Sequence, residues 1–373
     1  MTIVVKLGSS LVADRRGRVR RRLLSERAAE IGELSRAGER VCIVSSGAIA
    51  LGLRHLGVAR RPRATPQLQA ASAVGQVRLQ LAWTEALRKE RLQAAQLLLS
   101  AADLAERATY LNVRNALTAL LRLGVVPIVN ENDATATDEI TFGDNDALAA
   151  QVAVLVGARL LVLLTEVEGV YTAHPADPDA ELLAEGGSLE GIRLGAGSEY
   201  GRGGMESKIA SARLAAAAGI PTVIASGRGE SVVSAIVAGE GRGTRFAPAA
   251  SPASAFRLWL LHAKPARGSV VVDDGARAAL TEHGRSLLAV GIVSCDGSFE
   301  PGDAVELVAL DGTPLGKGLV GAAAAQLRLR SRGVEAVHRD KLVLYDLAVG
   351  GRVTAPSDAE ETSAAYLAST PDV

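Results

Sequence analysis

The 373 residues are enough for two or three domains, and the 48% that are hydrophobic provide a core of Leu, Val, Ile and Ala, because aromatic residues make up only 3%. The 41 basic and 41 acidic residues cancel, which argues against a protein that is mainly a nucleic-acid binder. No apolar run approaches the length of a membrane span, which argues against a membrane protein.

Apolar runs alternate with helical patterns through residue 246. The expected strands are residues 2–5, 41–44, 93–99, 125–129, 159–164 and 221–225. The expected helices are residues 23–36, 68–91, 101–123 and 147–156, with a further helix inside 201–220. Unbroken apolar strands that alternate with helices are typical of a parallel sheet covered on both faces. Residues 1–246 are therefore predicted to form an α/β domain with a mainly parallel sheet sandwiched by helices.

Residues 15–22 hold six arginines, in the sequence RRGRVRRR. Such a charge run is usually a solvated turn or hairpin, and we favour that interpretation over a nucleic-acid patch.

Small and polar residues follow two of the expected strands. Lys6 precedes Gly8 and two serines, and Ser46 precedes Gly47 after the second strand. In open α/β sheets, ligands gather outside the carboxyl ends of strands. Ser46 and Gly47 are therefore candidates for substrate contacts, although a serine in this place is as commonly a helix N-cap.

Two further polar clusters lie next to apolar elements. Residues 130–133 (NEND) follow a strand directly, and residues 142–146 (FGDND) precede a helix. Buried polar groups are costly without partners, so these residues either bind a polar ligand or satisfy one another. Asp144 or Asn145 could also cap the following helix. The repetition of the pattern favours a ligand site.

Residues 201–220 begin as a glycine-rich loop and continue as an alanine-rich helix, with Ser207 and Lys208 at the transition. Unpaired N–H groups at a helix start attract anions, and glycines allow a close approach of the backbone. The segment is either a binding site for a nucleotide phosphate or a plain loop before a surface helix. No GxxxxGK[ST] phosphate loop is present.

Residues 247–255 are rich in Ala, Pro and Ser and predict a linker. Beyond it, short strands at 268–272, 291–293, 304–309, 316–320 and 341–344, with one helix at 276–283, predict a small β-barrel-like domain over residues 256–354. Residues 355–373 are polar and alanine-rich, and we expect them to be disordered.

Two cysteines, Cys42 and Cys295, lie far apart in apolar runs. Buried reduced thiols fit this placement better than a disulfide, and the N-terminus lacks the charged start and cleavage site of a signal peptide. We therefore expect a cytoplasmic protein.

Six motifs in this order resemble the glutamate 5-kinase group of the amino acid kinase family. They are VVKLGSS (4–10), VSSGAIA (44–50), VNENDATAT (129–137), FGDNDAL (142–148), LLTEVEGVYT (163–172) and GGMESK (203–208). VDDGARAAL (272–280) and LLAVGI (287–292) are similar to a PUA domain. The resemblance covers nearly all of residues 1–350.

The resemblance implies an enzyme that transfers the γ-phosphoryl group of ATP to the side-chain carboxylate of L-glutamate. The product would be L-glutamyl 5-phosphate, in the first step of proline biosynthesis. It also implies Mg²⁺ as cofactor, feedback inhibition by proline, and a homo-oligomer, either a dimer or a tetramer. PUA domains bind RNA in other proteins, but zero net charge and few aromatic residues weigh against RNA binding here.

The resemblance also implies roles for single residues. Lys6 would contact the ATP phosphates, and Ser46, Asp133 and Asn145 would hold glutamate. Asp144 would hold Lys6 and Lys208 in place. The nucleotide would be bordered by Thr165, Glu166, Arg202, Gly203, Gly204, Met205, Glu206, Ser207 and Lys208. The family often has Asp where this chain has Glu166, and Thr where it has Arg202, which leaves the nucleotide contacts at these two positions open.

Phosphoryl transfer depends on positioning and charge neutralisation. We hypothesise that Lys6 and Lys208 flank the transferring phosphoryl group, while Mg²⁺ holds the β- and γ-phosphates. A carboxylate acceptor is already ionised at neutral pH, so no general base is needed and no histidine is assigned a role.

Two other functions are alternatives. The first is another kinase of the same family that acts on aspartate, acetylglutamate or uridylate. The PUA-like domain over residues 256–354 and the NEND and GDND loops argue against this alternative. The second is an RNA-binding role confined to the tail.

Overall fold

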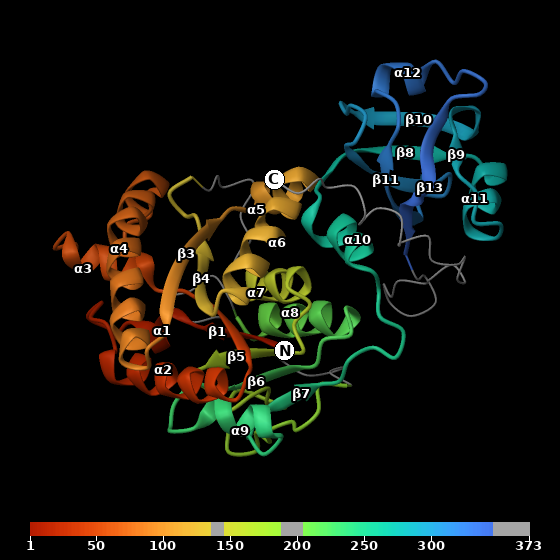
Figure 1. Ribbon diagram of the computed structural model, residues 1–373. Helices are drawn as coiled ribbons and strands as arrows, with labels where there is room; N and C mark the ends of the chain where they lie inside the picture. Colours follow the sequence, from red (N-terminus) through yellow and green to blue (C-terminus); the bar gives the residue numbers. More distant parts are fainter. Residues whose placement is uncertain (136–144, 188–203, 346–373) are drawn as a thin grey trace. The chain divides into compact units, whose positions relative to one another are not determined.

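The structure is a computed structural model that describes residues 1–135, 145–187 and 204–345. It divides into two compact units, with the boundary between Trp259 and Leu260 (Figure 1). The domain bounds 1–246, 247–255 and 256–354 stay predictions, and residues 355–373 lie outside the described residues.

A seven-stranded sheet forms the centre of the first unit, in the order β3-β4-β2-β1-β5-β6-β7. Neighbouring strands are parallel except β6 and β7, which are antiparallel, so the predicted mainly parallel sheet is confirmed. The strands are β1 (Thr2–Leu7), β2 (Arg40–Ser45), β3 (Gln93–Leu99), β4 (Val125–Glu131), β5 (Leu160–Thr165), β6 (Thr222–Ser226) and β7 (Thr244–Phe246).

Helices connect these strands (Figure 1). They are α1 (Ser9–Val12), α2 (Arg21–Arg36), α3 (Ala48–His55), α4 (Thr65–Lys89), α5 (Ala101–Ala105), α6 (Arg107–Arg122), α7 (Asn145–Leu155), α8 (Met205–Ala217), α9 (Val232–Ala238) and α10 (Ala255–Leu258). The single helix expected over residues 101–123 is two helices that meet at Glu106, because the backbone of this residue is extended rather than helical, with φ −89° and ψ 122°.

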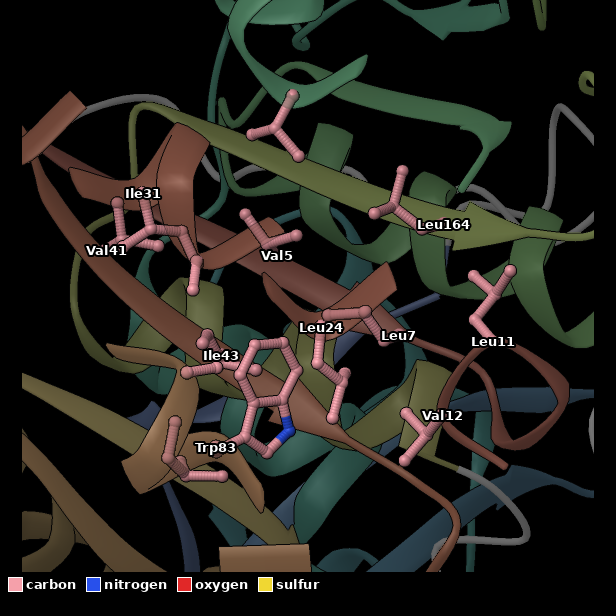
Figure 2. Packing of buried hydrophobic residues seen from close by; sticks show 14 of the residues in the cluster. Val5, Leu7, Leu11, Val12, Leu24, Ile31, Val41, Ile43, Trp83 and Leu164 are labelled. Carbon is pink, nitrogen blue, oxygen red and sulfur yellow. The ribbon is translucent and has the colours of Figure 1, made fainter. Parts of the chain in front are cut away.

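The strands bury different residues on their two faces. On β1, Val5 and Leu7 belong to a core cluster that includes Leu24 of α2 and Trp83 of α4 (Figure 2). Lys6 lies between them in sequence, so its side chain is on the opposite face, where α7 contacts β1. A strand buried on both faces therefore places one lysine among apolar neighbours.

The arginine-rich segment forms a turn, as the favoured interpretation expected. The Asp14 carboxylate accepts hydrogen bonds from the backbone N–H groups of Arg16 and Arg18 at 2.9 and 2.8 Å. Ala13 and Val19 pair on either side of the turn. The segment thereby connects α1 to α2.

Trp259 and α10 pack on the first unit. The Trp259 indole donates to the carbonyl of Leu104 at 2.8 Å, and the Arg107 guanidinium lies 5.3 Å from its ring centroid. Residues that follow the predicted linker therefore still contact α5 and α6.

The second unit is a six-stranded sheet in the order β10-β8-β11-β12-β13-β9. Neighbouring strands in this sheet are antiparallel except β8 and β11, which are parallel. The sheet packs around an apolar core of its own. Its elements are β8 (Ala266–Val272), α11 (Asp274–Thr281), β9 (Leu287–Leu288), β10 (Ile292–Gly297), β11 (Ala304–Ala309), β12 (Pro314–Val320), α12 (Ala324–Arg328) and β13 (Glu335–Leu344). Within the described ranges, no helix has the length and apolar character to cross a membrane.

Two glycines let α3 and α4 touch backbone to backbone. A Cβ on Gly75 would lie 1.8 Å from the carbonyl oxygen of Ala48, and a Cβ on Gly52 would lie 1.7 Å from that of Ala71. Atoms cannot approach so closely, and the obstacles are backbone. The contact holds the start of α3, which follows the Ser46–Gly47 turn.

We expect Gly75→Ala to destabilise the protein. A helical Gly→Ala change normally gains about 1 kcal/mol, but a clash with packed backbone costs about 3 kcal/mol, so the clash dominates. Urea unfolding followed by circular dichroism measures the difference. Gly187→Ala is the control, because a Cβ there meets nothing within 4 Å. Equal stability of the two variants would contradict the packing argument.

Candidate active site

Lys6 and Asp146 form a buried ion pair at the centre of the first unit. Lys6 is 4% exposed on β1, and Asp146 is fully buried in the first turn of α7. The Lys6 Nζ lies 2.6 Å from the Asp146 Oδ1. The packing of α7 across β1 brings the two side chains together.

Lys208 reaches the same carboxylate from another helix. It lies in the first turn of α8, which packs against α7, and is 8% exposed. Its Nζ donates to the Asp146 Oδ2 at 2.9 Å. Each carboxylate oxygen therefore contacts one ammonium, and two lysines that are far apart in sequence meet at one point.

The charges of this triad determine how Asp146 titrates. Burial acts to raise the pKa of Asp146, but the positive charges and hydrogen bonds of Lys6 and Lys208 outweigh it, so the pKa lies below its usual value. Asp146 is therefore an anion at neutral pH. Two cations and one anion leave a net positive charge in a protected place, which suits an anionic ligand.

The role of holding the two lysines was expected for Asp144. Asp144 lies outside the described residues, and the carboxylate found between the lysines is that of Asp146. The sequence offered two aspartates in the GDND motif and no means of choosing between them. The helix was expected to begin at residue 147, whereas α7 begins at Asn145. The prediction therefore did not place Asp146 in the first turn of the helix.

Asn145 links the ends of two strands. Its Nδ2 donates to Ser46 Oγ and to Asn130 Oδ1, both at 2.8 Å. Its Oδ1 accepts from the backbone N–H of Glu131 at 3.2 Å. Ser46 makes no side-chain cap to α3, whose N-cap is Gly47 with a φ of 110°. The Ser46 hydroxyl thus belongs to the polar group at the sheet edge.

Asp133 connects this edge to α4. Its Oδ2 accepts from Ser72 Oγ at 2.8 Å, and nearby Gln76 Nε2 donates to the carbonyl of Glu131 at 3.3 Å. Ser72 and Gln76 are 1% and 6% exposed. Sequence reasoning missed both, although two polar residues four apart in a helix lie on one face and could have been noticed.

The residues predicted to border the nucleotide come from β5 and the start of α8. Thr165 ends β5, and its carbonyl accepts from the N–H of Gly227 at 2.8 Å. Glu166 forms an exposed ion pair with Arg228 at 2.6 Å. Gly204 is the N-cap of α8 and makes no side-chain cap. Met205, Glu206, Ser207 and Lys208 form the first turn, while Arg202 and Gly203 lie outside the described residues.

The helix α8 offers N–H groups to an anion at the same point as Lys208. No side chain caps its N-terminus in the described structure, and α8 packs against β5, whose end carries Thr165. The N-terminus of the helix, with its backbone N–H groups, and the buried lysine in its first turn therefore give positive charge from two sources.

Comparisons with known proteins show which families the chain is similar to. A model of the amino acid kinase family matches residues 1–226, and a model of the PUA domain matches residues 268–341. The solved X-ray structure of isopentenyl phosphate kinase aligns with 66% of this chain and all of its own, at 23% identity and a TM-score of 0.49.

Curated relatives match over almost the whole chain. The glutamate 5-kinase of Paraburkholderia xenovorans is 44% identical over 361 residues, which is 92% of this chain and 97% of the relative. That of Burkholderia ambifaria is 43% identical over the same shares. The chain therefore belongs to the amino acid kinase family and, within it, to the glutamate 5-kinases.

Proposed function

We propose that this chain transfers the γ-phosphoryl group of ATP to the side-chain carboxylate of L-glutamate. The product is L-glutamyl 5-phosphate, in the first step of proline biosynthesis. The observation that carries the proposal is the meeting of Lys6 and Lys208 on one buried carboxylate at the ligand-binding edge of the sheet. The near-full-length similarity to glutamate 5-kinases supports the choice of acceptor.

The reaction brings two anions together. Two like unit charges 4 Å apart repel by about 4 kcal/mol at the effective dielectric of a partly buried site. Lys6 and Lys208 offset this repulsion, and Asp146 fixes their ammonium groups without cancelling both charges. Because the lysines are already held in place, little reorganisation is needed as charge shifts in the transition state.

The acceptor needs no general base, because a glutamate carboxylate is ionised at neutral pH. The residues have only to align its oxygen with the γ-phosphorus, which is a task of positioning. The rigid elements β1, α7 and α8 carry the charged side chains, which suits that task.

Glutamate is proposed to bind at the polar edge formed by Ser46, Asn145 and Asp133. Asp133 accepts hydrogen bonds and is suited to the α-ammonium group. Ser46 and Asn145 can each donate or accept and are suited to the carboxylates. Their mutual bonds orient them before substrate arrives.

ATP is proposed to lie along Thr165, Glu166 and the first turn of α8, with its phosphates toward Lys6 and Lys208. Kinases that act on ATP generally use Mg²⁺, which neutralises phosphate charge. Within the described ranges, no group of three or more His, Cys, Asp or Glu residues is suited to hold a metal ion.

Further assignments come from the sequence and its resemblance to the family, and they stay predictions. They are feedback inhibition by proline, a dimeric or tetrameric assembly, a cytoplasmic location, and a possible RNA contact through residues 256–354.

We expect the purified protein with Mg²⁺ and ATP to phosphorylate L-glutamate, with kcat/KM about a hundredfold above that for L-aspartate, N-acetylglutamate or UMP. A coupled assay of ADP release on the four acceptors measures this preference. Preferred turnover of another acceptor would contradict the proposed substrate and favour another kinase of the family.

We expect Lys208→Ala to lower kcat by about 100- to 1000-fold while glutamate affinity changes by less than about threefold, because the ammonium acts mainly on the transition state. Steady-state kinetics and glutamate binding measure the two effects. The exposed Lys89→Ala is the matched control, with expected wild-type kinetics. Turnover of Lys208→Ala within a few-fold of wild type would remove Lys208 from the mechanism.

The lowered pKa of Asp146 predicts an acid-dependent stability. Because its folded pKa lies below the unfolded value, the stabilisation is complete above about pH 4 and is lost as pH falls through the folded pKa. Asp146→Asn leaves two buried cations without their counter-ion and should cost about 3–5 kcal/mol at pH 7. Urea unfolding from pH 7 to pH 3 should show the gap shrinking below about pH 4. A constant gap would show that the carboxylate is not the titrating group.

A further inference from the structure

A second buried charge pair lies on α2, away from the lysine triad. Arg27 is fully buried and Glu30 is 4% exposed, and Arg27 Nη2 lies 2.6 Å from Glu30 Oε1. Buried ion pairs are weak sources of stability, because desolvation offsets most of their attraction. The partners that the pair holds therefore indicate its purpose.

The pair contacts the loop between β6 and α9, residues 227–231, and the start of α9. Arg27 Nη2 donates to the carbonyl of Gly229 at 2.6 Å, and its Nη1 lies 3.5 Å from that of Gly227. Glu30 Oε2 accepts from the backbone N–H groups of Val233 and Ser234. Arg27 thus holds the carbonyl groups of the loop, and Glu30 holds the N–H groups at the start of α9.

This loop adjoins the elements assigned to the nucleotide. The N–H of Gly227 donates to the carbonyl of Thr165, and Arg228 pairs with Glu166. A Cβ on Gly227 would lie 2.3 Å from Leu11 Cδ1, so the backbone of the loop packs closely against Leu11 of α1. This helix follows Lys6 and Gly8 in the sequence. The position of the loop therefore affects both Thr165–Glu166 and the turn after β1.

We propose that Arg27 and Glu30 are positioning residues for the nucleotide: they fix the 227–231 loop, which in turn sets Thr165, Glu166 and the turn after β1 for binding ATP. The inference rests on the proposed function for the identity of the nucleotide. Neither residue contacts the reacting groups in this arrangement. Their effect passes through backbone groups of the loop.

The test is the double variant Arg27→Met/Glu30→Met, which removes both charges and keeps buried, unbranched side chains. Binding of the non-hydrolysable analogue β,γ-imido-ATP with Mg²⁺ is measured by calorimetry, together with glutamate binding and amide hydrogen exchange. We expect the analogue Kd to rise about tenfold, glutamate binding to stay within about twofold, and exchange to increase over residues 227–234.

The control is Arg36→Met/Glu90→Met, which removes a more exposed ion pair between the last residue of α2 and the C-cap of α4. It should bind the analogue as wild type does. If the double variant at residues 27 and 30 does not fold, Arg27→Lys replaces it, because a single ammonium cannot reproduce the fork that reaches Glu30 and the loop carbonyls. It is likewise expected to weaken analogue binding.

The outcomes separate this inference from the proposed function. An unchanged analogue Kd in a folded variant overturns the inference and leaves the proposed function standing. A wild-type protein that binds the analogue but does not phosphorylate glutamate overturns the proposed function, while weaker analogue binding by the variant still supports the inference. A wild-type protein that binds no analogue overturns both.

Discussion

The Asp146 carboxylate joins three elements that are distant in the chain, because each of its oxygens contacts a different lysine. Without this anion, two ammonium groups could not be buried together, since each would repel the other in a medium of low dielectric. The anion therefore makes a concentrated positive site possible inside an apolar sheet. The same contact links β1, α7 and α8, so the charges proposed to serve catalysis also hold these three elements together.

The parallel sheet explains why the polar residues collect where they do. Each parallel strand ends at the same edge, and the connection after it begins there. Ser46 follows β2, Asn130 is the second-last residue of β4, Thr165 ends β5, and Asn145 is the first residue of α7. Asn145 then bonds to both Ser46 and Asn130, so the edge is a connected network before any ligand binds. A buried network whose members satisfy one another is rigid, and rigidity favours the alignment that phosphoryl transfer requires.

The sequence predicted much of the fold because its signals are local. Apolar runs marked the strands of both units, and glycines marked many of the turns. The break at Glu106 and the short strands β7 and β9 were missed. The break depends on the extended backbone of one residue, and the two strands depend on pairing with β6 and β13. At the site, Lys6 and Lys208 were predicted, but Asp146 was not. Choosing between two neighbouring aspartates requires the direction of a side chain in the first turn of a helix, which periodicity alone does not give.

The first unit contains two buried ionic groups that differ in net charge and in the atoms they contact. The lysine triad has an excess of positive charge and lies where an anion is proposed to bind. The Arg27–Glu30 pair is neutral overall, and its hydrogen bonds go to backbone groups of the 227–231 loop and of the start of α9. A neutral pair that satisfies backbone groups fixes a shape, whereas an unbalanced group attracts a ligand. The contacts of each group therefore indicate its proposed role. The Arg27–Glu30 pair is proposed to position a loop, and the lysine triad is proposed to stabilise the charge of a ligand.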